Sequence, residues 1–161
     1  MYKITTNFNH AIAGKGFYSK GMNSSVTLEQ STKAICAMDK IQPSLEHVSQ
    51  AIAAKVDEYN SRLPADPEGK ATPELLAERK NLFEEIDNVK SEPIVFEIGD
   101  DKDYIALLAV MEQSVKAIYK MIQDKNEGGE VDENNPVPTN EEFGWLCKFE
   151  GEVKDAEKLK S

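Results

Sequence analysis

The sequence predicts a mainly helical, single domain of four or five helices, with at most a small two-stranded ribbon. Between Thr32 and Lys90, apolar residues recur every three or four positions, which is the pattern of helix faces that need covering. A second apolar stripe, wider than the first, covers Tyr104–Ile122. The clearest two-residue alternation covers only Ile94–Ile98, the length of one short strand. Helices should therefore dominate the fold.

The amino-terminal residues 1–26 are predicted to form an irregular arm. Tyr2–Thr6 shows the alternation of a short strand and could pair with Ile94–Ile98, but three glycines interrupt the remainder of the segment. The segment is nevertheless too apolar for a free tail. It could pack on its own domain or extend onto a partner. The candidate partner-binding residues are Phe8, Lys15, Phe17, Tyr18 and Lys20.

A helical domain over residues 27–126 should come next. Its first helix could be capped by Thr27 or by Ser31. Pro43 then lies within an unbroken apolar pattern, so we expect either one kinked helix or two helices with Pro43 in the first turn of the second. The helix over Ser44–Leu63 and the loop Pro64–Ala71 lead to a second start signal at Thr72, which precedes a proline and an acid.

These two helices are expected to form an antiparallel hairpin around which the rest of the chain is organised. The second should end near Ser91, because Pro93 keeps Glu92 out of the helical conformation. The hairpin should bury four residues: Leu45, Val48, Ile52 and Leu82.

The helix Tyr104–Ile122 begins after three aspartates that favour its positive end, and Gly128 and Gly129 end it. Its apolar arc is too wide for a one-sided surface helix. We expect the hairpin to cover one part, and either the last helix or a second copy of the chain to cover the rest.

Residues 127–139 are predicted to be a linker, because they combine glycine, proline, asparagine and acids. Residues 140–161 should form the carboxy-terminal helix, opened by a capping box between Thr139 and Glu142. We expect Lys154–Ser161 to be frayed.

Charge and composition limit the possible partners. The net charge is −10, yet residues 1–28 contain three lysines and no acid. An acidic body is repelled by nucleic acids and by anionic membranes, so neither is expected as a partner. Cys36 and Cys147 are too few for a disulfide framework and lack metal-ligand spacing, so we expect reduced thiols. No apolar run approaches the roughly 18 residues of a membrane span, and Met1–His10 does not resemble a signal peptide.

No residue pattern specifies a reaction. His10 and His47 have no partner at ligand spacing, and Gly14-Lys15-Gly16 lacks the rest of a phosphate-binding loop. The acids at Asp100–Asp103 fail the spacing of a calcium loop and are better explained as helix caps. We therefore predict no catalytic residue, no metal site and no cofactor, and a protein that is not an enzyme.

One family resemblance rests on the order of elements. A helical pair is followed by a helix containing Leu82-Phe83-Glu84-Glu85-Ile86, the strand Val95-Phe96-Glu97-Ile98 and a helix containing Leu107-Leu108. Over residues 32–122 this order resembles small uncharacterised proteins of tailed bacteriophages. The resemblance implies a virion-associated or phage accessory role, in the host cytoplasm or the virion, and it implies no catalytic residue.

The leading hypothesis is a non-enzymatic protein–protein interaction, assembly or accessory subunit that binds a protein partner or forms a homo-oligomer. One alternative is an acidic inhibitor that occupies a basic, nucleic-acid-binding surface of a host or defence protein. A third is an enzyme whose site is assembled from scattered polar residues.

Overall fold

A computed structural model describes residues 1–22, 26–62, 72–129 and 136–159, and within them the chain forms six helices and three strands. The elements in chain order are β1 (Tyr2–Thr6), α1 (Phe8–Met22), α2 (Leu28–Asp39), α3 (Gln42–Ser61), α4 (Pro73–Ser91), β2 (Ile94–Ile98), α5 (Asp101–Asn126), α6 (Asn140–Lys154) and β3 (Glu157–Lys158). The mainly helical class is confirmed. The hairpin loop Pro64–Ala71 and residues 130–135 of the predicted linker lie outside the described residues.

The three strands form one antiparallel sheet with β1 in the centre. The predicted pairing of Tyr2–Thr6 with Ile94–Ile98 is confirmed, in a register that places Ile4 opposite Phe96. Burial alternates along β2 as a two-residue period requires, so one face of the sheet is packed and the other is wet. The expectation of a frayed carboxy terminus was wrong for Glu157–Lys158, which pair with the other side of β1 and extend the ribbon to three strands.

The prediction that residues 1–26 form an irregular arm was wrong. Phe8–Met22 is a helix that packs between α5 and α6, and Ala11 is fully buried within the main core. Asn7 starts this helix, because its side-chain Oδ1 accepts a hydrogen bond from the His10 backbone N–H at 3.0 Å. The amino-terminal segment therefore packs on its own domain, which was one of the two alternatives, the other being that it extends onto a partner. Residues 1–26 therefore share a core with the remainder of the chain, rather than forming a separate unit.

Capping residues define the helix boundaries, as the sequence predicts. Thr27, rather than Ser31, caps α2 through a capping box with Gln30. The chain then forms two helices with Pro43 in the first turn of the second, rather than one kinked helix. Thr72 caps α4, and the capping box of Thr139 opens α6.

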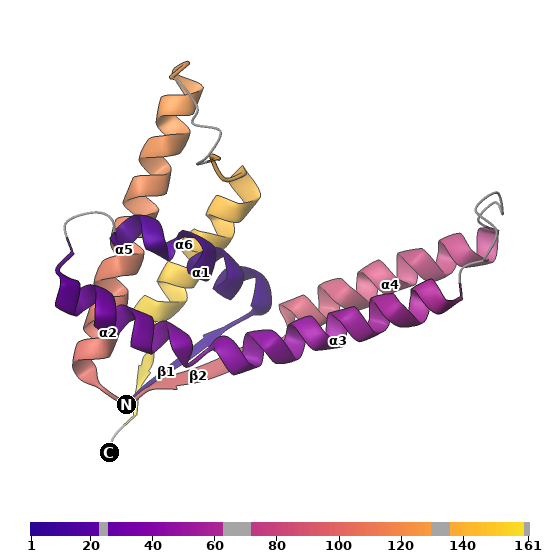
Figure 1. The fold of residues 1–161 in the computed structure, drawn as a ribbon, viewed down its shortest axis with the longest axis horizontal. Coiled ribbons are helices and arrows are strands. Elements are labelled where there is room, and N and C mark those ends of the chain that lie inside the picture. Colours follow the sequence, from indigo (N-terminus) through magenta and orange to yellow (C-terminus); the bar gives the residue numbers. More distant parts are fainter. Residues whose placement is uncertain (23–25, 63–71, 130–135, 160–161) are drawn as a thin grey trace.

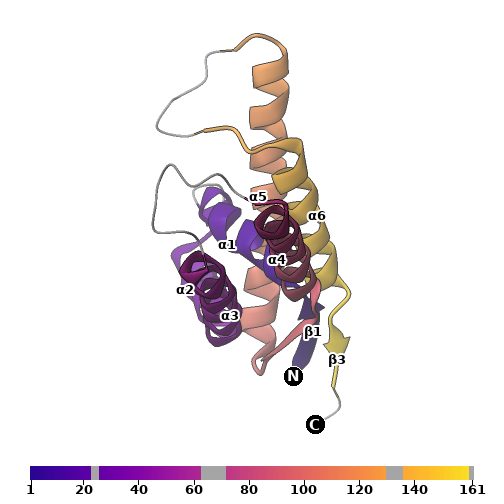
Figure 2. The ribbon, with the colours of Figure 1, turned by 90° about the vertical axis from the view of Figure 1, so that its right-hand side faces the viewer.

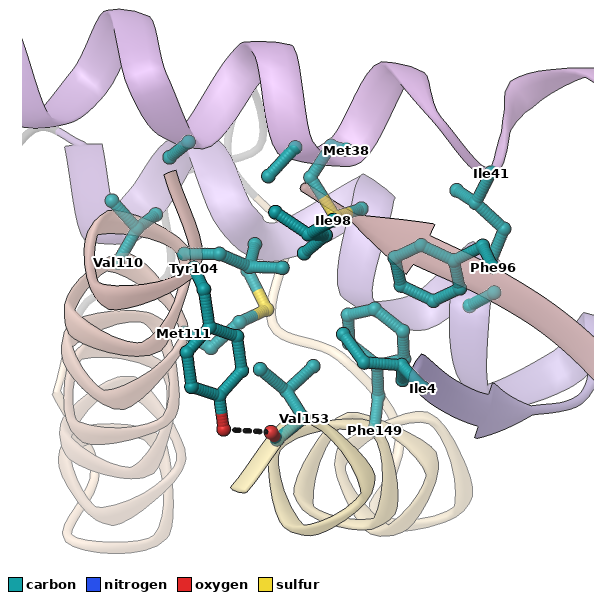
Figure 3. Packing of buried hydrophobic residues seen from close by; sticks show 14 of the residues in the cluster. Ile4, Met38, Ile41, Phe96, Ile98, Tyr104, Val110, Met111, Phe149 and Val153 are labelled. Atoms are coloured by element: carbon teal, nitrogen blue, oxygen red, sulfur yellow. Dashed lines mark hydrogen bonds between the residues drawn. The ribbon is translucent and has the colours of Figure 1, made fainter. Parts of the chain in front are cut away.

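Helix α5 is the centre of the core. Its buried side comprises Tyr104, Ala106, Leu107, Val110, Met111, Ser114 and Ile118. Helices α1, α2 and α6 provide most of its cover, and Figure 3 shows Tyr104, Val110 and Met111 facing side chains from α2, α6 and the sheet. The last helix is thus a cover of Tyr104–Ile122. The hairpin was expected to cover one part of this helix. Its base joins the same core through Leu45, but α3 and α4 provide little of the cover of α5.

Helices α3 and α4 pack on each other as an antiparallel hairpin that projects from this body (Figures 1 and 2). Leu45 in α3 and Ile86 in α4 are the buried residues of these two helices. Val48, Ile52 and Leu82 are half-buried, so the prediction of full burial holds only for Leu45. The two-helix pairing was predicted correctly, but its place at the centre of the molecule was wrong.

Candidate functional site

The projecting hairpin has two open sides of different chemistry. Along one side runs a hollow of about 270 Å³, lined by Lys55, Glu58, Tyr59, Arg62, Glu78, Asn81, Leu82 and Glu85. Two ion pairs cross it: Lys55 Nζ lies 3.2 Å from Glu85 Oε2, and Arg62 lies 3.6 Å from Glu78. Arg62 also pairs with Glu58 at the end of its own helix, at 2.6 Å. These groups are largely solvent-exposed, so each pair adds at most about 1 kcal/mol to stability. This side is polar and is partly satisfied internally.

The other side of α4 exposes large apolar side chains that no other element of the described residues covers. Leu76 and Phe83 are seven positions apart, which places them on one face of the helix, and they are 53% and 52% exposed. The Arg79 guanidinium lies 5.4 Å from the centre of the Phe83 ring, a cation–π contact. Aromatic and arginine side chains are enriched in protein–protein interfaces relative to the rest of a protein surface. This is the strongest candidate site for a binding function.

A second polar cluster joins β1 and α1 to α6. Glu152 Oε1 lies 2.9 Å from His10 Nδ1 and accepts a hydrogen bond from Thr6 Oγ1, also at 2.9 Å. The other ring nitrogen, His10 Nε2, lies 3.4 Å from the Asn7 amide. Both ring nitrogens of His10 therefore already have partners, and Thr6 is buried and engaged with the carboxylate. These hydrogen bonds stabilise the packing of the start of α1 against α6.

The five predicted partner-binding residues do not form a common exposed surface. Phe8 and Tyr18 pack against the main core, and Phe17 packs against a smaller cluster around Ile118. Burial, and secondarily the charge of Asp39, raise the pKa of Tyr18. Lys15 is exposed and donates a hydrogen bond to Gln42, while Lys20 is half-buried. A binding role for these residues therefore receives no support from their positions.

The remaining reactive side chains are dispersed. His47 lies at the base of the hairpin, in a hollow of about 400 Å³ lined also by Pro43, Val48 and the start of β2. Cys36 is exposed on α2, and burial together with Glu150 raises the pKa of the Cys147 thiol, which makes it a weaker nucleophile. Within the described residues, no three histidine, cysteine or acidic side chains are grouped so that they could hold a metal ion.

Sequence reasoning included Phe83 in the apolar stripe of its helix but did not identify it as a surface residue. The available signal was the width of that stripe, because Leu76 and Phe83 lie outside the positions that face α3. The contacts of His10 with Glu152 connect residues far apart in the chain, so no local motif could indicate them.

Comparisons with protein-family models, with curated proteins and with solved structures find no match for this chain. In the described part of the chain, no helix combines the length and apolar character needed to cross a membrane.

Proposed function

We propose that this protein is a non-enzymatic interaction subunit that binds another protein chain through the α3–α4 hairpin. One observation carries the proposal: a projecting hairpin, with one buried residue in each helix, displays Leu76 and Phe83 more than half exposed on the side opposite its polar hollow. Neither the sheet nor α5 covers that side, because the hairpin packs mainly on itself and on α1.

Burial of the exposed apolar side would supply the binding free energy. Covering Leu76 and Phe83 completely is worth about 2 kcal/mol for each side chain, of which roughly half remains to be gained at their present exposure. A partner helix laid along this side of α4 would cover Leu76 and Phe83 together, as helices in grooves do.

The same hairpin supports an assembly or accessory role better than catalysis. Its polar hollow contains ion pairs that neutralise one another, and its other side offers apolar contact area. A virion-associated or phage accessory setting remains a prediction from the family resemblance.

Site-specific photocrosslinking tests the proposal. A photoreactive phenylalanine analogue placed at Phe83 should form covalent adducts with a protein when cells producing the protein are irradiated. Tyr119 on α5 is a matched control, because it is also an aromatic residue with 52% exposure but lies on the body. The proposal predicts adducts from position 83 that are absent from position 119. Equal crosslinking from both positions, or none from position 83, would contradict it.

A further inference from the structure

We infer that the partner of the hairpin is a second copy of this chain, and that two hairpins pack antiparallel as a four-helix bundle about a twofold axis next to Phe83. This inference rests on the proposed function and names its partner. It is carried by the arrangement of charge on the exposed face of α4.

That face is a regular stripe. Leu76, Lys80, Phe83 and Asp87 are separated by four, three and four positions, which places them along one side of the helix. All four side chains are exposed. We call this set the Phe83 face. The hollow on the other side of α4 is lined instead by Glu78, Asn81 and Glu85, so the two faces are distinct.

The charges of the Phe83 face are complementary to themselves. Lys80 and Asp87 are equally far from the midpoint between residues 83 and 84. Lys80 lies before this midpoint and Asp87 lies after it, each at a distance of about 5 Å along the helix axis. A twofold axis at that midpoint places Lys80 of each copy opposite Asp87 of the other. It also brings the two Phe83 rings together at the axis. A twofold interface requires such self-complementarity. If one residue of the first copy contacts a second residue of the other copy, the same contact is repeated with the two copies exchanged.

Both charges are available for such contacts. Neither Lys80 nor Asp87 takes part in a side-chain ion pair within the described part of the chain, in contrast to Lys55, Arg62 and Glu85 on the polar side. Helix α3 also permits close approach, because Ser49 and Ala53, on the side away from Lys55, are small and exposed. The midpoint lies close to the middle of α4, so the two hairpins would overlap along most of their length.

Charge exchange tests this register. Sedimentation equilibrium at low salt should give a dimer mass for the unmodified chain. Lys80→Glu alone, or Asp87→Lys alone, sets like charges against each other at two symmetry-related places and should weaken the dimer about tenfold or more in Kd. The double variant Lys80→Glu/Asp87→Lys restores opposite charges and should recover most of the affinity. Asn81→Glu is the control, because it adds an acid next to Lys80 but on the polar side, and it should leave Kd unchanged.

Folding of each variant is checked by circular dichroism, and these exposed positions should leave the spectrum unchanged. A monomer mass for the unmodified chain at high concentration overturns the inference, as does a double variant that folds but fails to recover. The photocrosslinking at position 83 separates the two proposals. Adducts with a different protein overturn the second-copy inference and leave the proposed function standing, whereas the absence of any adduct removes both.

Discussion

Gly14 shows how a single residue determines the packing of two helices. A Cβ atom at this position in α1 would lie 2.3 Å from Cδ1 of Phe149, whose ring is fully buried in α6. Glycine therefore permits the close approach of α1 to α6. The sequence shows a glycine-rich segment, but whether a glycine breaks a helix or admits a neighbouring side chain depends on contacts that only the fold supplies.

Gly14→Ala should therefore destabilise the protein by about 1–3 kcal/mol, although alanine favours helices, because the buried Phe149 ring has to move. Gly16→Ala is a matched control in the same helix, since a Cβ there meets nothing within 4 Å, and it should be neutral or stabilise by up to about 1 kcal/mol. Urea unfolding monitored by circular dichroism measures both. Equal changes from the two substitutions would contradict the close packing at Gly14.

Deprotonation of Tyr104 should lower the stability of the fold at alkaline pH. Its hydroxyl donates a hydrogen bond of 2.7 Å to the Val153 carbonyl, and its ring stacks on Tyr2. Burial, followed by the nearby Tyr2 and Asp155, raises the pKa of Tyr104 above its usual value of 10.0. The unfolded chain then releases this proton more readily, so the stabilisation is complete below about pH 10 and is lost as the pH rises from there through the folded pKa.

Tyr104→Phe should cost about 1 kcal/mol at neutral pH, because the Val153 carbonyl loses the hydrogen bond from the hydroxyl, although it keeps the 3.3 Å bond from the Ala156 N–H. The variant should also lose less stability than the unmodified protein between pH 9 and pH 11, with a remaining loss from Tyr18, whose pKa is raised as well. Urea unfolding across this pH range is the measurement. Parallel losses in the two proteins would show that Tyr104 does not titrate as described.

At the scale of elements, the sequence predicts those features that depend on residues close together in the chain. The side chains of the caps Thr27, Thr72 and Thr139 each accept a hydrogen bond from the backbone N–H three residues ahead. The sequence identifies Thr72 and Thr139, and offers Thr27 as one of two candidates. Strand β2 shows its alternation directly. Helix α1 and strand β3 were missed for a common reason: α1 is stabilised by distant contacts with α5 and α6, and β3 by pairing with the opposite end of the chain.

A chain that begins at Val26 should consequently fail to fold. It lacks β1, the central strand of the sheet, and the buried Ile4 and Ala11 of the main core. The expected result is loss of the cooperative thermal transition and increased binding of a hydrophobic dye to the exposed faces of α5 and α6. A truncated chain that keeps its helical spectrum and melting temperature would instead support a dispensable amino-terminal segment.

At the scale of the whole molecule, the sequence pattern indicated two helices that pair but could not show their distance from the core. The residues Val48, Ile52 and Leu82 have the spacing of a buried face, yet in the fold they belong to a projection and remain half-buried. Periodicity reports that a face needs cover, without identifying the element that covers it. The same ambiguity left Phe83 unrecognised as a surface residue, and it is resolved here by the position of the hairpin relative to α5.

The central claim is that the hairpin's open side is completed by another protein chain, here a second copy. Hydrogen–deuterium exchange at two protein concentrations tests this most directly. In the dilute, monomeric protein, amides of α3 and α4 should exchange much faster than those of α5, because little buried contact holds the hairpin closed. At a concentration that forms the dimer, protection in α4 around Phe83 should rise while protection in α5 stays constant. Protection of α4 that does not depend on concentration would contradict the claim.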